Sequence, residues 1–543
     1  MNRIEIGLAE KGENLLSINI KIAKAYIILI TASFIGHILS MGKEILVANY
    51  FGISMKMDAF YTAITIPNLI TSIIVGTFGL VFLPIFVNYK TTDREEANRI
   101  ASISINYIFI FMLFASIIIF FFSKQIIFYS FRGLNTETAL LSINILKILS
   151  ITVVFTGLIG VMTWILNAYK HFSAPSFSQM FITISIIAFI LLFVKRMGVY
   201  VFAWGTLVGL IIQFVFLLPF TKKEGYSHYF DFNLNHPALK KTIKLSLIFI
   251  LLGIISGITP VINRIMASWL PSGSIAALAY ADKLVQVPLI IFSGSIATAI
   301  YPFFAGQLAE NKIDEMKDTL ATSIKMTGFI FIPLAVTMMI LSKPTIQLLF
   351  QRGAFDEHAT NLTSAIFICY SFQLFSNYAL VIMMRLLLVF QDMMSILKIT
   401  ITSVVFTVLL NFIFIKIVNP PAAGIALSSS VVCLFTAILY FGFLKKRIKN
   451  LHGLSIIKSL LKTTVLAVIS GMVIFSAYQF LNKFIFNQSI LNKIIILTGA
   501  TFSGIIIFII MTVIFKIEEA EKIYTLIKNK VQNILKFGII KKV

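Results

Sequence analysis

Long apolar runs follow one another along the whole chain and are separated by short polar segments. Each run is about 20 residues long, which lets an α-helix cross roughly 30 Å of hydrocarbon. Runs such as ASIIIFFF (115–122) lack the apolar–polar alternation of transmembrane β-strands. The pattern therefore predicts an all-α polytopic membrane protein with about 14 transmembrane helices. The predicted spans are 23–49, 57–88, 101–122, 138–167, 173–194, 198–220, 242–269, 277–306, 319–341, 359–390, 393–417, 421–444, 459–482 and 491–515.

The composition indicates the same class. Of 543 residues, 58% are hydrophobic and only 12% are charged, and the mean hydropathy is +0.95. One soluble core cannot bury so much apolar surface, so a soluble globular protein is excluded. The N-terminal stretch MNRIEIGLAEKGENLLSINI is charged and mixed, so we expect no cleavable signal peptide.

The net charge of +23 is spread over alternate loops rather than gathered in one module. With the N-terminus inside, roughly thirty Lys and Arg lie in inside segments and about ten in outside ones, as the positive-inside rule expects. We therefore predict a multi-pass membrane protein with both termini cytoplasmic. The basic segments 445–462 and 516–543 are interpreted as topology signals that contact membrane lipids, not nucleic acid.

The longest predicted inside connection, 221–244, follows the sixth span and separates a first lobe from a second bundle. MDAFYTAITIPNLI (57–70) and AYADKLVQVPLI (279–290) each place an aspartate ahead of a proline in the second span of their half. Repeated halves around a substrate site are common in secondary transporters. We therefore expect the site to lie between helices.

Residues suited to catalysis or metal binding do not form a recognisable motif. The two cysteines, Cys369 and Cys433, lie inside predicted spans, and the six histidines are scattered. We find no HExxH, P-loop or GxSxG pattern. We therefore expect a transporter rather than an enzyme, with no metal and no organic cofactor.

Ionisable residues inside the predicted spans are the main candidates for function, because each costs roughly 2.5–3.5 kcal/mol at the bilayer centre. If their helices border one cavity, it is cationic and suits an anionic lipid headgroup. Two alternatives stay open: Lys43 snorkels to the outer interface, and Asp58 contacts a helix dipole. Neighbours Lys43 and Glu44 point about 100° apart, so we expect each to need a separate partner or water. The candidate substrate-binding residues are His37, Lys43, Glu44, Asp58, Arg264, Asp282 and Lys283.

Four separated motifs carry a family resemblance that covers nearly the whole chain. They are KEILVANYFGISMKMDAFYTAITIPNLI (43–70), ILNAYKHFSAPSFS (165–178), YADKLVQVPLIIFSGSIATAIYPFF (280–304) and LLFQRGAFDEHAT (348–360). With them the chain resembles the MviN/MurJ family of lipid II flippases, part of a superfamily that also holds multidrug exporters and polysaccharide flippases.

The resemblance implies about fourteen helices in two six-helix lobes around a central cavity, plus two C-terminal helices that form a groove for the lipid tail. The domains then read as an N-lobe (1–220), a cytoplasmic connection (221–244), a C-lobe (245–450), the tail groove (451–515) and a basic tail (516–543). It also implies alternating access driven by membrane potential or a monovalent cation, Na⁺ or H⁺, with a lipid-linked glycan as substrate and envelope-synthesis enzymes as partners.

Carried over residue by residue, the resemblance is incomplete. Family members usually have arginines where this chain has His37, Lys43 and Lys283, so the charge is partly kept and the bidentate fork is lost. Asp58 and Asp282 match acidic family positions, whereas Gln286 replaces a glutamate. For a cation site, Asn263 and Asp392 are the nearest candidates.

The leading hypothesis is a flippase for a polyprenyl-pyrophosphate-linked envelope precursor, most readily lipid II. The alternatives are a flippase for an exopolysaccharide or O-antigen unit, a transport-inactive membrane scaffold, and a multidrug exporter, which the cationic residues disfavour.

Overall fold

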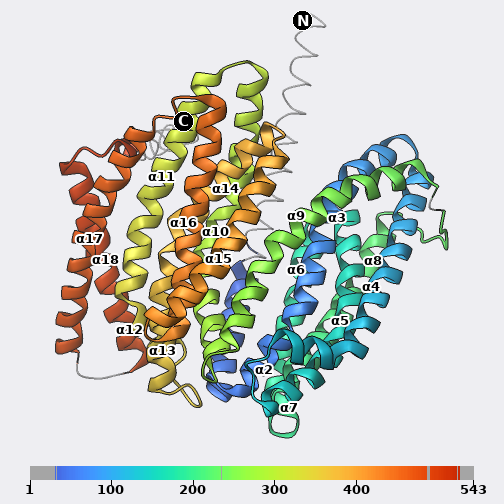
Figure 1. The fold of residues 1–543 in the computed structure, drawn as a ribbon, viewed down its shortest axis with the longest axis horizontal. Helices are drawn as coiled ribbons and strands as arrows, with labels where there is room; N and C mark the ends of the chain where they lie inside the picture. The colour runs from blue at the N-terminus through green and yellow to red at the C-terminus, as the bar shows by residue number, and fades with distance from the viewer. Residues whose placement is uncertain (1–30, 32–33, 234, 486–488, 523, 526–543) are drawn as a thin grey trace, which may run out of the picture. The chain divides into compact units, whose positions relative to one another are not determined.

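The computed structural model describes residues 31, 34–233, 235–485, 489–522 and 524–525. The start of the first predicted span and residues 526–543 of the basic tail lie outside this range. The described residues form α-helices, short turns and loops, and no strand. An unlabelled helix covers 34–51. The others are α2 (Met55–Ala63), α3 (Thr65–Thr92), α4 (Arg94–Ser130), α5 (Thr136–Ala168), α6 (Ser173–Ser178), α7 (Met180–Met197), α8 (Tyr200–Lys223), α9 (Pro237–Ala267), α10 (Ser274–Ala309), α11 (Ile313–Ile340), α12 (Ser342–Leu349), α13 (Glu357–Ser371), α14 (Gln373–Val389), α15 (Met393–Ile417), α16 (Pro421–Ile448), α17 (Gly453–Phe484) and α18 (Ile490–Ile514) (Figure 1).

Twelve helices in the described part of the chain are long and apolar enough to cross a membrane. This confirms the predicted all-α polytopic class, with the count of fourteen an approximation. The span predicted at 277–306 is helical and forms most of α10. Three predicted spans contain a break: the second is divided into α2 and α3, the fifth into α6 and α7, and the tenth into α13 and α14.

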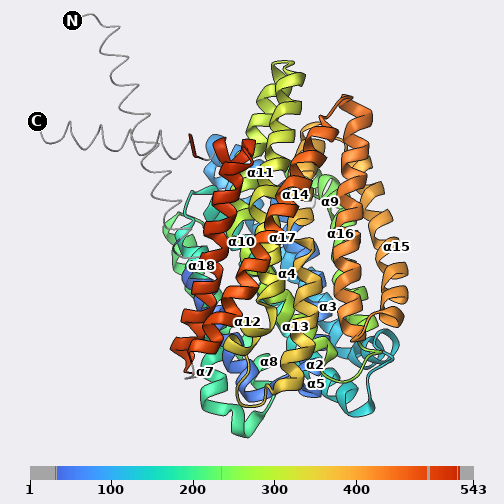
Figure 2. The ribbon, with the colours of Figure 1, turned by 90° about the vertical axis from the view of Figure 1, so that its left-hand side faces the viewer.

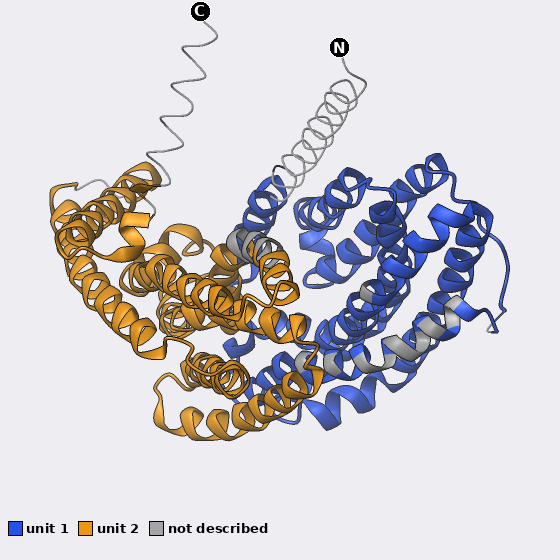
Figure 3. Ribbon diagram, turned by 90° about the horizontal axis from the view of Figure 1, so that it is seen from above, with its two compact units in different colours: residues 1–276 blue, residues 277–543 orange. Residues whose placement is uncertain are grey.

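The chain forms two compact units, residues 1–276 and 277–543 (Figure 3). This division differs from the predicted lobe boundary at 221–244, because α9 packs against α3 in the first unit. Gly253 and Gly257 permit this approach: a Cβ on Gly257 would lie 2.8 Å from Leu69 Cδ1. The predicted lobes themselves stay a prediction.

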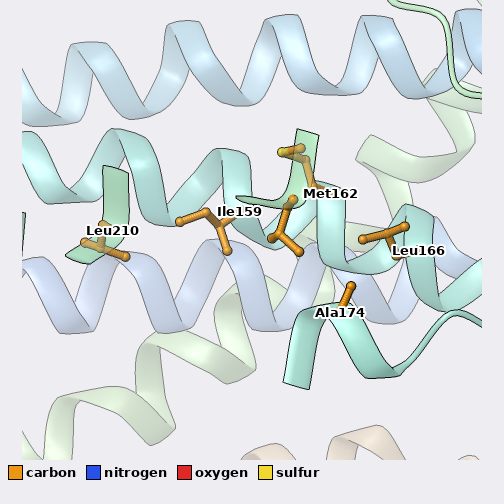
Figure 4. Close-up of a cluster of buried hydrophobic side chains, with 6 residues drawn as sticks. Ile159, Met162, Leu166, Ala174 and Leu210 are labelled. Atoms are coloured by element: carbon orange, nitrogen blue, oxygen red, sulfur yellow. The ribbon is translucent and has the colours of Figure 1, made fainter. Parts of the chain in front are cut away.

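In the first unit, α5 is the central helix and contacts α2, α3, α4 and α8. A buried cluster fixes α5 against α6 and α8; five of its six members are labelled in Figure 4. Burying such side chains contributes about 1.5–3 kcal/mol each in water, whereas in lipid close packing supplies the stabilisation. The cluster consists of Ile159, Met162, Leu166, Ala174, Leu210 and Leu217.

In the second unit, α17 and α18 run side by side and α17 also packs against α11 (Figure 2). The rings of Phe331 on α11 and Tyr378 on α14 stack with centroids 3.5 Å apart. The Tyr378 hydroxyl donates to the Pro288 carbonyl of α10. These contacts join α10, α11 and α14 within this unit.

The connection between α8 and α9 is fastened along α4 and is here called the strap (residues 224–232). Polar side chains spaced four residues apart on one face of α4 hold it: Arg94, Asn98, Ser102 and Asn106. Gly225 has a φ of +81°, and a Cβ there would lie 2.1 Å from the Arg94 guanidinium. The bonds run from Arg94 to Glu224 O (2.5 Å), Asn98 to Gly225 O (3.0 Å), Tyr229 N to Ser102 Oγ (3.0 Å), and Asn106 to Tyr229 O (3.2 Å) and Asp231 O (2.9 Å).

Candidate functional site

Lys43 and Glu44 lie on the helix 34–51 and form an ion pair, with Lys43 Nζ 2.8 Å from Glu44 Oε1. The prediction that these neighbours need separate partners is wrong. The Glu44 side chain is only 4% exposed and that of Lys43 19% exposed. Because a buried unpaired carboxylate is costly, the flexible lysine chain bends around the helix to reach it.

Arg264 of α9 reaches the break between α2 and α3. Its Nη1 donates to the Tyr61 carbonyl (3.2 Å) and to Thr65 Oγ1 (2.8 Å). Tyr61, which is buried, lies within electrostatic range of both Glu44 and Arg264. Four helical segments of the first unit, namely the helix 34–51, α2, α3 and α9, therefore bring together what we call the ionic cluster: Lys43, Glu44, Tyr61, Thr65 and Arg264.

Asp58 lies in the first turn of α2, but its carboxylate caps a different helix. The prediction that it contacts a helix dipole therefore applies to that second helix. Oδ2 accepts from Gly273 N (2.5 Å) and Oδ1 from Ala276 N (2.8 Å), at the N-terminus of α10. Negative charge is stabilising there because the first N–H groups of a helix lack intrahelical partners. Asp58 is 3% exposed, so it is a buried cap in this structure, and its predicted contact with substrate stays a prediction.

His37 and Asn263 are both partly buried. His37 precedes Glu44 by two helical turns on the helix 34–51, and Asn263 is the neighbour of Arg264 on α9. Their predicted roles in binding substrate and cation stay predictions.

Asp282 and Lys283 lie on α10, in the second unit, and are partly buried. Gln286, one turn further on, donates from Nε2 to Asp282 Oδ1 at 3.3 Å. The amide that replaces the family glutamate is thus a hydrogen-bond donor to this carboxylate. That Lys283 and Lys43 share one chamber stays a prediction.

Asp392 caps α15, accepting from Ser395 N (3.1 Å) and Ser395 Oγ (2.8 Å), and its Oδ2 also lies 3.1 Å from Arg447 Nη1. Burial acts to raise the pKa of Asp392, but the hydrogen bonds from Ser395 and the charge of Arg447 outweigh it and the pKa is lowered. A cation at Asp392 would have to displace Arg447. Among the described residues, no group of three or more His, Cys, Asp or Glu is placed to hold a metal.

The second unit contains a polar hollow and an apolar hollow, and the tail groove predicted for the two C-terminal helices stays a prediction. The polar one of about 380 Å³, the α12 pocket, lies between α12, the end of α17 and the start of α18. The apolar one of about 590 Å³, the α11–α17 groove, lies between those two helices. The motif at 348–360 begins with the last two residues of α12, but a helix of eight residues is too short to appear as a span in a hydropathy profile.

The twelve described helices that are long and apolar enough to cross a membrane define a polytopic membrane protein. The family model described as "Lipid II flippase MurJ" matches residues 47–495. The chain is 31% identical over 475 residues to the probable lipid II flippase MurJ of Buchnera aphidicola subsp. Acyrthosiphon pisum (strain APS), covering 83% of this chain and 91% of the relative. It is 25% identical to the lipid II flippase MurJ of Burkholderia cenocepacia, covering 77% and 82%.

Two solved structures share the fold. "Lipid II flippase MurJ, inward closed conformation" matches with a TM-score of 0.74 and 23% identity over 90% of this chain and 98% of the other. An inward-facing MATE multidrug transporter matches with a TM-score of 0.67 and 15% identity over 77% and 95%. The chain belongs to the lipid II flippase MurJ family.

Proposed function

We propose that this protein is a flippase that moves a polyprenyl-pyrophosphate-linked envelope glycan precursor, lipid II for peptidoglycan synthesis, from the inner to the outer leaflet by alternating access. The observation that carries the proposal is the family match over residues 47–495. The shared fold with an inward-closed MurJ and an inward-facing MATE transporter supports alternating access.

The ionic cluster suggests how a diphosphate is held and released. Lys43 is paired with Glu44 at 2.8 Å. A diphosphate competes with Glu44 for the ammonium, and charge-assisted bonds to phosphate are among the stronger hydrogen bonds. When the headgroup leaves, Glu44 recovers Lys43, which keeps the cation from trapping the product. In this proposal Lys283 and His37 supply further positive charge, with Asp282 tuning Lys283.

Membrane potential is the driving force that fits the charge of the cargo. Each elementary charge that crosses the membrane exchanges about 2.3 kcal/mol per 100 mV. When an anionic headgroup moves outward from a negative interior, the step is favoured by this free energy for each negative charge moved. Coupling to Na⁺ or H⁺ is the alternative, with Asn263 and Asp392 as the residues to examine.

The proposed location is the bacterial inner membrane, with both termini in the cytoplasm and membrane lipids and envelope-synthesis enzymes as partners. The distribution of Lys and Arg supports this orientation. Accessibility of single engineered cysteines in the 1–24 and 516–543 segments to an impermeant thiol reagent in intact cells tests it, since cytoplasmic termini stay unlabelled.

Complementation of a bacterium depleted of its own lipid II flippase tests the function. We expect the wild-type protein to restore growth, Lys43→Ala to fail, and Lys43→Arg to succeed. Lys56→Gln, an exposed lysine in the first turn of α2, is the charge-matched control. Membrane levels of each variant are measured by immunoblot.

Headgroup translocation in proteoliposomes separates the remaining outcomes. Failure of the wild type in cells together with translocation of another polyprenyl-diphosphate glycan would assign an exopolysaccharide or O-antigen substrate. No translocation of any such lipid would assign a transport-inactive scaffold. Full rescue by the double variant Lys43→Ala, Lys283→Ala would refute the proposed diphosphate contacts.

A further inference from the structure

The α12 pocket is rich in hydrogen-bond donors. Its polar lining consists of the amides Gln347, Gln351 and Asn482, the hydroxyl of Tyr478 and the ammonium of Lys493, and no carboxylate lines it. Within the described residues Lys493 has no ion-pair partner. A pocket of this composition suits an anion that accepts several hydrogen bonds.

The α11–α17 groove is apolar. Val336 and Ile340 of α11 form one wall, and Val468, Met472 and Phe475 of α17 form the other. Gly471 makes the two helices meet closely at its floor, since a Cβ there would lie 2.5 Å from Ile340 Cδ1. An extended hydrocarbon chain fits such a groove.

The lining residues of the groove and of the pocket follow one another along one face of α17. Residues 471 and 475 line the groove and 478, 482 and 485 line the pocket, and this alternation of four and three places them in one row on a helix. Ile340 of the groove and Tyr478 of the pocket also pack against the same buried cluster. Together the two hollows have the shape of an amphiphile, with a polar head beyond an apolar chain.

Basic residues gather at this end of the second unit, although this end is predicted to lie on the outer side of the membrane. By the lysine and arginine distribution, the loops before α13 and before α18 face outside, where basic residues are few. Yet Lys343 and Lys483 flank the pocket next to its lining residues Pro344 and Asn482, and Lys493 lines it. Lys343 is only weakly engaged, 3.8 Å from Glu357.

We propose that the second unit holds an anionic glycerophospholipid, with its phosphate headgroup in the α12 pocket at Lys493 and one acyl chain in the α11–α17 groove. The lipid comes from the surrounding membrane, since the size of the pocket, about 380 Å³, matches a glycerophosphate headgroup. The site is independent of which glycan is transported. Its lipid joins α11, α12, α17 and α18.

Native mass spectrometry of the full-length purified protein tests this site, with dioleoyl-phosphatidylglycerol and dioleoyl-phosphatidylcholine as probes. We expect the wild type to retain the anionic lipid preferentially. Lys493→Gln should lower its retention about tenfold, the size of a lost charge-assisted bond. Lys493→Arg should preserve it, and Lys56→Gln in the first unit should change nothing.

A second variant tests the groove without changing charge. Ser476→Trp places a large ring in the groove and should lower retention of both lipids. Equal retention by Lys493→Gln and the wild type, or undiminished retention by Ser476→Trp, would overturn the proposal. Retention of inorganic phosphate equal to retention of the lipid would indicate a site for a free anion, which would also overturn the proposal. Displacement of phosphatidylglycerol by an equimolar polyprenyl diphosphate would reassign the site to the cargo, which also overturns it.

Discussion

Replacing Asp58 with alanine should destabilise the first unit more than removing an ordinary helix cap. Asp58 is 3% exposed, and its two oxygens accept from Gly273 N at 2.5 Å and Ala276 N at 2.8 Å. Alanine leaves both N–H groups without their acceptor in a buried place. Each unsatisfied buried donor costs about 1–3 kcal/mol, so the expected loss for the two donors is about 2–6 kcal/mol.

Two further variants calibrate this magnitude. Asp58→Asn keeps one carbonyl acceptor but faces its amide toward a backbone donor, so we expect an intermediate loss of about 1–3 kcal/mol. Asp356→Ala removes the cap of α13, which makes one bond, to Ala359 N at 2.8 Å, and is exposed. Water can replace that cap, so its loss should be about 1 kcal/mol.

The free energy of unfolding is measured by SDS titration in mixed micelles, followed by tryptophan fluorescence and circular dichroism. The expected order of destabilisation is Asp58→Ala, then Asp58→Asn, then Asp356→Ala. If Asp58→Ala cost no more than Asp356→Ala, the reasoning that Asp58 is a buried double cap would be refuted. A transport defect without loss of stability would instead favour a direct contact between Asp58 and the substrate.

Three other perturbations probe the first unit. Arg264→Lys cannot reproduce the bonds to both Tyr61 O and Thr65 Oγ1, and we expect about 1–2 kcal/mol lower stability in the same titration; an unchanged midpoint would contradict this. Asn106→Leu removes two bonds to the strap, so amide exchange of 224–232 should rise, while exchange in α16 stays constant. The hydrogen bond from Arg99 lowers the pKa of Asp231 below its ordinary 3.8, so its stabilising effect is present above that value and is lost as pH falls through the lowered pKa. Strap exchange, corrected for intrinsic rates, should therefore rise on acidification below about pH 4, and Arg99→Gln should weaken this dependence, with the backbone hydrogen bond from Asn233 to Asp231 remaining.

The membrane helices could be predicted because hydropathy is a local property: the residues of each span are sufficient to identify it. The same locality explains what was missed. Asp58 and Gly273 are separated by 215 positions, so no pattern near Asp58 reveals its partner. Arg264 and Thr65, 199 positions apart, are a comparable case.

The packing of α9 was also hidden from the sequence. The longest loop precedes α9, which favoured a boundary there, but loop length does not decide which helix a face packs against. Only the structure shows that side chains of α3 fill the space beside Gly253 and Gly257. For Lys43 and Glu44, the angle between neighbours was right, but the reach of a lysine chain decided the pairing.

The strap determines where this protein can bend. A linker between two membrane helices usually offers slack, but this one is bonded to α4 at every turn from Arg94 to Asn106. Pulling the end of α8 away from the beginning of α9 would have to break those bonds one after another. We therefore expect the pivots of the first unit to lie at interruptions within its helices. The foremost is the break at Ile64 between α2 and α3, where Arg264 donates to Tyr61 O on one side and Thr65 Oγ1 on the other.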